Sequence, residues 1–83
     1  MHNFNKMEIQ IISFGKISEF INNQNIDIDS INDTDGLKLY LEQLFPNLVG
    51  MKYKLALNKN LVQHNSEIHD RDTIAIMPPF SGG

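Results

Sequence analysis

Residues 34–45, TDGLKLYLEQLF, place their apolar side chains at helical spacing along one stripe. The stripe consists of Leu37, Tyr40, Leu41, Leu44 and Phe45. Thr34 is the expected N-cap, Asp35 stands where the helix dipole favours a negative charge, and Pro46 ends the run. The stretch predicts an amphipathic helix that buries this stripe against a sheet.

Two strand patterns precede the helix. Residues 7–14 (MEIQIISF) begin with alternation and become apolar on both sides at Ile12 and Phe14, which is typical of a strand in the middle of a sheet. Residues 25–29 (NIDID) alternate around Ile26 and Ile28 after an Asn-rich tract suited to a turn, so they predict a hairpin with the first strand. Residues 15–21 (GKISEFI) between them predict one or two turns of helix.

Three further strand patterns follow the helix. Residues 53–58 (YKLALN) alternate, Leu61 and Val62 form a short apolar pair, and the β-branched residues of 73–77 (TIAIM) predict a final strand. The simplest packing for this order of elements is one mixed sheet of four to five strands with the main helix on one face. The expected fold class is therefore α+β, and the expected architecture is a β-grasp (ubiquitin-like) roll.

The length of 83 residues allows one hydrophobic core. We expect residues 1–6 to be a flexible N-terminal extension, residues 7–77 to form the β-grasp domain, and residues 78–83 to form an extended tail. No stretch approaches the roughly 18 consecutive apolar residues that a membrane helix requires. The first residues, MHNFNK, lack the apolar run of a signal peptide, so a cytoplasmic protein is expected.

Composition narrows the classes of function. The absence of cysteine excludes disulfide frameworks, thiolate zinc sites and cysteine nucleophiles. The net charge of −3 argues against nucleic acid or an anionic membrane as the main partner. The acidic run in residues 27–35 and the lysines of residues 52–59 are interpreted as solvated faces. His64 and His69 are interpreted as surface histidines because their spacing suits neither a strand face nor a helix face, so no metal site is expected.

The last six residues are the informative part of the chain: Pro78, Pro79, Phe80, Ser81, Gly82 and Gly83. The prolines supply no backbone donor and fix φ near −65°, so the sheet must stop at Met77. Glycines lack Cβ and can enter a channel too narrow for other residues, with the free carboxylate at its far end. Six residues at about 3.3 Å each reach roughly 20 Å. Such a carboxylate can be adenylated by a partner and then attacked by sulfur or an amine.

At this point the chain resembles the small, sulfur-carrier subunit of molybdopterin synthase from Met7 onward. The ending PPFSGG is close to the family's Pro-Pro-Val-Ser/Thr-Gly-Gly, and residues 14–19 resemble its Phe-Ala-x-x-Arg-Glu segment. Ala56-Leu57-Asn58 resembles its Ala-Val-Asn strand, and residues 70–72 stand where it has Asp-Gly-Asp. Ser18 replaces the usual Arg and Arg71 replaces the turn Gly.

The resemblance implies a mechanism. An adenylating (E1-like) enzyme, using ATP with Mg, activates the Gly83 carboxylate, and a persulfide sulfur donor converts it to a thiocarboxylate. The loaded tail enters the large subunit of molybdopterin synthase and passes sulfur to cyclic pyranopterin monophosphate. The isolated chain is not an enzyme in this scheme and binds no cofactor.

The resemblance also implies the site residues. Gly83 carries the chemistry and Gly82 precedes it in the channel. The expected partner-binding residues are Phe14, Leu61, Met77, Pro78, Pro79, Phe80 and Ser81. For Phe14, Leu61 and Met77, ordinary core packing is the alternative.

Two other functions stay open: a sulfur carrier for another route such as the thiamine thiazole, whose carriers generally lack the double proline, and a ubiquitin-like modifier that joins Gly83 to a lysine. A plain interaction module is a third.

Overall fold

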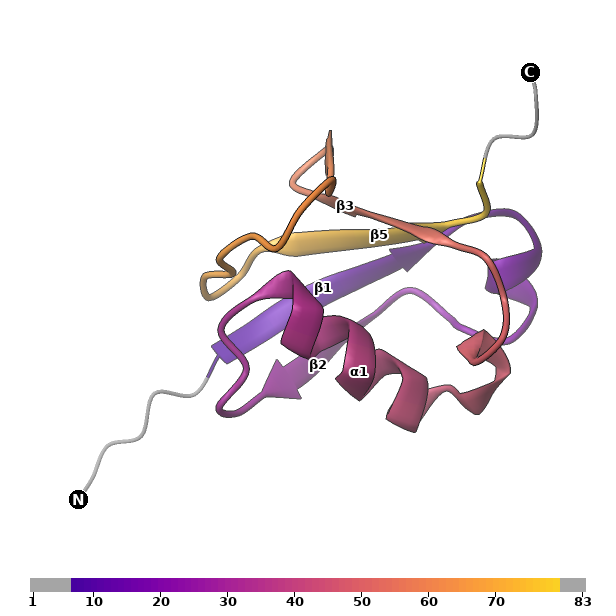
Figure 1. Ribbon diagram of the computed structural model, residues 1–83. Helices are drawn as coiled ribbons and strands as arrows, with labels where there is room; N and C mark the ends of the chain where they lie inside the picture. The colour runs from indigo at the N-terminus through magenta and orange to yellow at the C-terminus, as the bar shows by residue number, and fades with distance from the viewer. Residues whose placement is uncertain (1–6, 80–83) are drawn as a thin grey trace.

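The computed structural model describes residues 7–79 (Figure 1). Its strands are β1 (Met7–Ser13), β2 (Gln24–Ile28), β3 (Lys54–Leu57), β4 (Asn60–Leu61) and β5 (Thr73–Met77). Its helices are α1 (Thr34–Leu44) and two short 3-10 helices, η1 (Gly15–Glu19) and η2 (Pro46–Leu48). The expected N-terminal extension at residues 1–6 lies outside the described residues.

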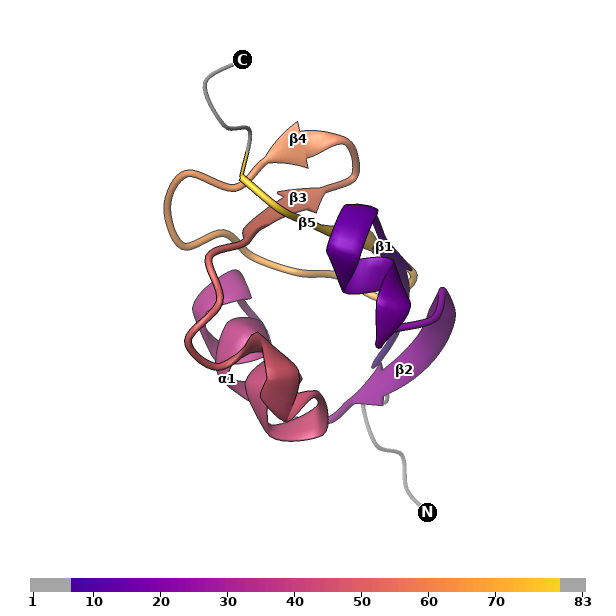
Figure 2. The ribbon, with the colours of Figure 1, turned by 90° about the vertical axis from the view of Figure 1, so that its right-hand side faces the viewer.

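The five strands form one mixed sheet in the order β2-β1-β5-β3-β4. The central strands β1 and β5 are parallel, and every other neighbouring pair is antiparallel. Figure 2, which looks along the strands, shows α1 on one side of the curved sheet. The predicted β-grasp fold, with a mixed sheet and one main helix on one face, is confirmed.

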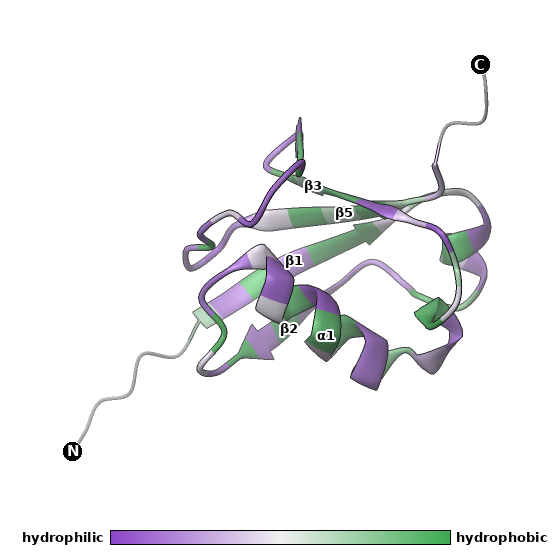
Figure 3. Ribbon diagram, in the orientation of Figure 1, coloured by the Kyte–Doolittle hydropathy of each residue, from purple (hydrophilic) through white to green (hydrophobic). Residues whose placement is uncertain are grey.

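The core lies between α1 and the sheet. Ile9 and Ile11 of β1 and Ile74 and Ile76 of β5 are at most 1% exposed, and the hydrophobic colour in Figure 3 follows these two strands. The rest of the core comprises Ile17, Ile21, Ile28, Leu37, Leu41, Leu48, Leu55 and Ile68. Because α1 covers one face only, the opposite face of the sheet has no helix over it among the described residues.

Two details of the predicted helix are wrong. Leu37 and Leu41 are fully buried, but Leu44 is 41% exposed, because Leu48 of η2 and the half-buried Phe45 fill the core at that end. The N-cap is Asp33, whose carboxylate accepts the Gly36 N–H at 2.9 Å. Thr34 is buried instead, since its N–H donates to the Ser66 carbonyl at 2.8 Å.

The β3–β4 hairpin also differs from its pattern. Strand β3 is shorter than predicted. Ala56 alternates with Leu55 and Leu57 and was expected on the polar side of the strand, but it is only 5% exposed. Asn58 and Lys59, with φ of 50° and 76°, form the two-residue turn to β4, and positive φ at both positions is the signature of a type I′ turn. The short strand β4 therefore comprises Asn60 and Leu61 instead of Leu61 and Val62.

Candidate functional site

An apolar row crosses the sheet face that α1 leaves open. Ile12 pairs with Ala75, Ala75 pairs with Ala56, and Ala56 pairs with Leu61. Directly paired residues of neighbouring strands point to the same face. The four side chains therefore form one continuous row over β1, β5, β3 and β4, which we call the open-face row.

Phe14 and Met77 adjoin this row at the end of the central strands. The Phe14 N–H donates to the Ile76 carbonyl at 3.0 Å, which places Phe14 beside the end of β5. Phe14 is 49% exposed and Leu61 is 42% exposed, and neither belongs to the core. A hollow of about 470 Å³, lined in part by Ile12, Phe14 and Ala75, lies on this face. Exposed apolar side chains gathered on one face are suited to contact with another protein.

The structure thus brings three predicted partner-binding residues together. Phe14, Leu61 and Met77 share the open face, and core packing does not account for Phe14 or Leu61. That these residues bind a partner stays a prediction. Ile12 and Ala75 were not predicted as site residues, although the apolar run on both sides of the first strand was a signal for Ile12.

The chain leaves the sheet at its central strand. Strand β5 ends at Met77, where Pro78 supplies no N–H for a further ladder bond. Pro78 packs against Gly15: a Cβ at Gly15 would lie 2.8 Å from the Pro78 Cγ, and Gly15 has φ +59°. Only a residue without Cβ fits this conformation and this contact. The sequence did not single out Gly15 as a site residue, and its place directly after Phe14 is the only local signal.

The prolines are the last residues of the site that the structure describes. Pro78 is half-buried and Pro79 is exposed. The remaining predicted residues, Phe80, Ser81, Gly82 and Gly83, lie outside the described residues.

Ser18 supports the loop beside this exit. Its hydroxyl donates to the Ser13 carbonyl at 3.0 Å, and the Ser13 hydroxyl donates to the Ile21 carbonyl at 2.5 Å. The serine that departs from the family's arginine therefore connects η1 to the end of β1.

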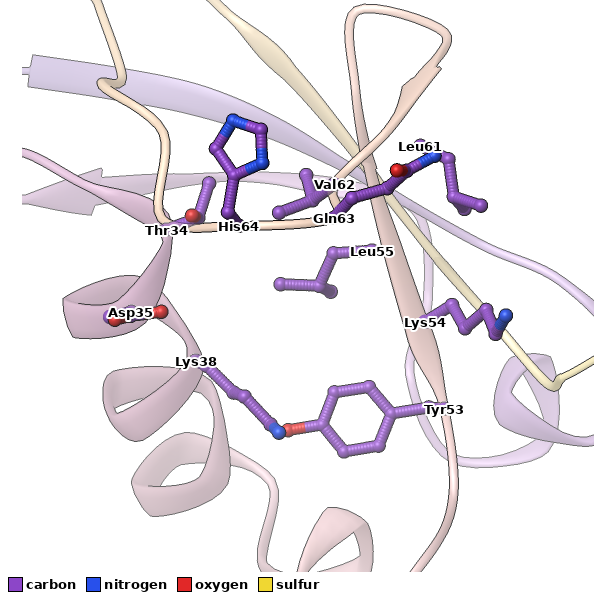
Figure 4. Close-up of a pocket in the computed structure, with 10 residues that line it drawn as sticks. All are labelled: Thr34, Asp35, Lys38, Tyr53, Lys54, Leu55, Leu61, Val62, Gln63 and His64. Atoms are coloured by element: carbon purple, nitrogen blue, oxygen red, sulfur yellow. The ribbon is translucent and has the colours of Figure 1, made fainter.

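A second cleft of about 490 Å³ lies between α1 and β3 (Figure 4). Leu55 and Val62 contribute apolar lining, and Lys38 and Tyr53 approach each other with 5.3 Å between the Lys38 Nζ and the ring centroid. The Tyr53 hydroxyl donates to the Glu42 carboxylate at 2.5 Å. Burial, together with this hydrogen bond to Glu42, raises the pKa of Tyr53 above its usual range. Tyr53 therefore ties the start of β3 to α1 as a neutral donor.

His64 and His69, the two histidines within residues 7–79, form no metal-binding group. His64 lines the second cleft, and His69 lies 3.7 Å from the Glu67 carboxylate and 4.0 Å from that of Asp72. Within residues 7–79, no group of three or more His, Asp or Glu side chains is placed to hold a metal ion. In the same part of the chain, no helix has the length and apolar character needed to cross a membrane.

A family model described as the ThiS family matches residues 11–83. The chain belongs to the ThiS family. This match covers the whole described sheet except the first residues of β1, and it includes the Gly-Gly end. The resemblance to small sulfur carriers seen in the sequence is confirmed at the level of the family.

Solved structures share the fold of this chain. One is a complex of subunits 1 and 2 of molybdopterin-converting factor from Helicobacter pylori, with 30% identity, a TM-score of 0.63, and coverage of 93% of this chain and 100% of that one. A protein from Pyrococcus furiosus, assigned as subunit 1 of molybdopterin converting factor, has 13% identity and a TM-score of 0.79, with coverage of 89% and 99%.

The small archaeal modifier protein SAMP1 from Methanosarcina acetivorans is also similar. Its TM-score is 0.71 at 21% identity, and the match covers 95% of this chain and 99% of that chain. Likeness at this identity establishes the shared β-grasp fold.

Proposed function

We propose that this chain is a sulfur carrier for molybdenum cofactor biosynthesis that carries its sulfur on the carboxyl group of Gly83. The observation that supports this most directly is the place where the chain leaves the sheet. Residues 78–83 follow the central strand β5, beside an open apolar face formed by Phe14, Leu61 and Met77. A partner that covers this face receives the terminal carboxylate within about 20 Å of the sheet.

The proposed chemistry belongs to the partners. An adenylating enzyme joins the Gly83 carboxylate to AMP and releases pyrophosphate from ATP. The terminal sulfur of a persulfide attacks the acyl carbon, AMP leaves, and a thiol reductant cleaves the remaining S–S bond to free the thiocarboxylate. The large synthase subunit then directs this sulfur to cyclic pyranopterin monophosphate. This chain contributes the surface on which the partners dock and a tail that reaches their active sites, and it supplies no catalytic acid or base.

The large subunit as partner is supported by the Helicobacter pylori structure, in which subunits 1 and 2 of the converting factor form a complex. The open-face row and Phe14 are the surface that we assign to this contact. The cytoplasmic location expected from the sequence, and the absence of a cofactor bound by this chain, remain predictions.

Intact-mass measurement tests the proposal. The chain is incubated with its adenylating enzyme, ATP, Mg and a persulfide donor, and we expect the mass to rise by one oxygen-to-sulfur exchange. Deletion of Gly83, or Gly82→Val, should abolish this change and the formation of molybdopterin. Thermal melts should match wild type, because the core cluster consists of residues that precede the tail. A truncated chain that still supports product formation contradicts the mechanism.

The fold likeness to an archaeal modifier protein favours one second candidate, a ubiquitin-like modifier. In that case Gly83 forms an amide with a lysine of a target protein and no sulfur is exchanged. The same intact-mass experiment in a cell extract separates the two functions, because a modifier gives covalent adducts of higher mass. The thiamine thiazole alternative gives the same thiocarboxylate, so it is tested by supplying a large synthase subunit and measuring molybdopterin.

A further inference from the structure

Acidic side chains gather at the end of the molecule where β1 and β5 begin. Glu8 pairs with Asp27 across the β1–β2 ladder, and the Asp70 carboxylate accepts the Glu8 N–H at 2.8 Å. Asp33 forms an isolated β-bridge with Glu67 immediately before the start of α1. Most of the ten acidic residues lie here: Glu8, Asp27, Asp29, Asp33, Asp35, Glu67, Asp70 and Asp72. Lys59 and Arg71 also lie at this end, and Arg71 approaches Asp70 at 3.7 Å.

Lysines surround the opposite end, where the tail leaves. Lys54 pairs with Met77, the last residue of β5, and Figure 4 shows its side chain extending away from Tyr53 and Leu55. Lys16 follows Gly15, the residue that contacts Pro78, and Lys52 precedes β3. We call Lys16, Lys52 and Lys54 the exit lysines.

The exit lysines are available for a partner. All three are exposed, and none forms an ion pair within residues 7–79. The acidic residues on the elements around them are Glu19 of η1 and Glu42 of α1, and Glu42 accepts the Tyr53 hydroxyl. Positive charge therefore predominates at the exit, although the whole chain has a net charge of −3.

A docking partner is attracted or repelled mainly by the charges that lie nearest to it. The Debye length is about 8 Å at physiological ionic strength, so charges at the far end of the sheet are screened from a partner at the exit. A partner that takes the tail meets the exit lysines first. Charges at the rim of an interface act mainly on the association rate and its salt dependence.

We propose that the exit lysines dock on an acidic rim around the active-site entrance of the adenylating partner. This inference rests on the proposed function, since only a tail that is delivered to another active site needs orienting. Attraction between the exit lysines and this rim favours the orientation that brings the tail to the entrance.

Charge reversal at opposite ends of the sheet tests the inference. Lys54→Glu reverses an exit charge, whereas Arg71→Glu makes the same change of net charge at the far end, in the turn before β5. Association with the purified adenylating enzyme is followed by stopped flow at low and physiological salt. We expect Lys54→Glu to lower the association rate constant about tenfold at low salt, and Arg71→Glu by less than about twofold. Lys54→Arg should keep the wild-type rate, and Lys16→Glu on η1 provides a second reversal if Lys54→Glu fails to fold.

The outcomes separate the inference from the proposed function. Wild-type association should slow as salt rises. Association that accelerates with salt, or equal effects of the reversals at Lys54 and Arg71, would refute the proposed acidic rim. A wild-type chain that acquires sulfur normally in that case leaves the proposed function intact. A wild-type chain that neither binds the enzyme nor acquires sulfur refutes both.

Discussion

Arg71 holds a backbone conformation that glycine adopts with less strain. Its φ is +70° in the turn before β5, where its N–H donates to the Glu8 carbonyl at 2.6 Å. The side chain is 89% exposed and makes one ion pair, with Asp70. The turn therefore has positive φ at the position where the family resemblance led us to expect glycine.

We predict that Arg71→Gly stabilises the domain. A left-handed conformation costs a residue with Cβ about 1–2 kcal/mol, and the greater freedom of glycine in the unfolded chain offsets part of the gain. The expected net increase in the free energy of unfolding is about 0.5–1 kcal/mol by urea titration. Arg71→Ala removes the same side chain and keeps Cβ, so it should give no such increase. Equal stabilities of the two variants would show that the conformation is unstrained.

The Asp33 cap makes stability depend on pH. The Gly36 N–H and, second, the Asn65 side chain hold the pKa of Asp33 below its ordinary value of 3.8. Because the folded-state pKa is the lower one, the stabilisation is complete above the unfolded value and is lost as pH falls through the folded value. We predict that the melting temperature of wild type falls more steeply between about pH 4 and pH 2 than that of Asp33→Asn. Thermal melts across this range measure both slopes, and parallel curves would contradict the assignment.

At the scale of the element, the positions of the apolar stripe on α1 contribute very differently to the stability of the fold. Leu41 is fully buried against the sheet, and Leu44, three residues later, is 41% exposed. The start of the helix depends on a distant segment, since the Asn65 side chain accepts the Asp35 N–H at 2.9 Å. The helix is therefore held at its first turn by capping and in its middle by burial.

The matched pair Leu41→Ala and Leu44→Ala measures this difference. Leu41→Ala should lower the free energy of unfolding by about 2–5 kcal/mol, because it leaves a cavity in a small core. Leu44→Ala should lower it by less than about 1 kcal/mol, as is usual for an exposed position. Denaturant unfolding of both variants provides the comparison. A loss at Leu44 as large as at Leu41 would mean that Leu44 is buried in solution.

At the scale of the whole molecule, both proposed partners reach the tail over one face and one exit. The open-face row crosses β5 at Ala75, and Phe14 and Lys54 lie beside the end of this strand. With a reach of about 20 Å, the six tail residues require either partner's active site to lie close to this end of the sheet. The two proposed partners therefore need the same surface.

We predict that the adenylating enzyme and the large synthase subunit bind this chain in mutually exclusive fashion. Purified large subunit is added to the preformed complex with the adenylating enzyme, and size-exclusion chromatography with light scattering should show exchange of the partner. Phe14→Ala should weaken both complexes, because the exposed ring lies beside the exit. A stable ternary complex with a single copy of this chain would refute the prediction.

The sequence by itself determined the elements and their order. Apolar periodicity and turn residues are local, so they predicted α1, all five strands and the class of sheet with bounds within one or two residues. The stop at Met77 was predictable because a proline cannot donate to a ladder. The terminal glycines and the family resemblance pointed to Gly82 and Gly83, which lie outside the described residues.

The tertiary structure decided what the distant parts of the chain do to one another. Strand pairing joined Ile12, Ala75 and Leu61 into one face, and the contact between Gly15 and Pro78 set the exit. Packing by η2 left Leu44 exposed, and pairing with residues 65–66 buried Thr34 and left the cap to Asp33. Register also placed the acids and the exit lysines at opposite ends of the sheet. None of these features follows from a local sequence pattern, because each depends on which strands are neighbours and on their register. The order and register of the strands are set by the burial of the whole core.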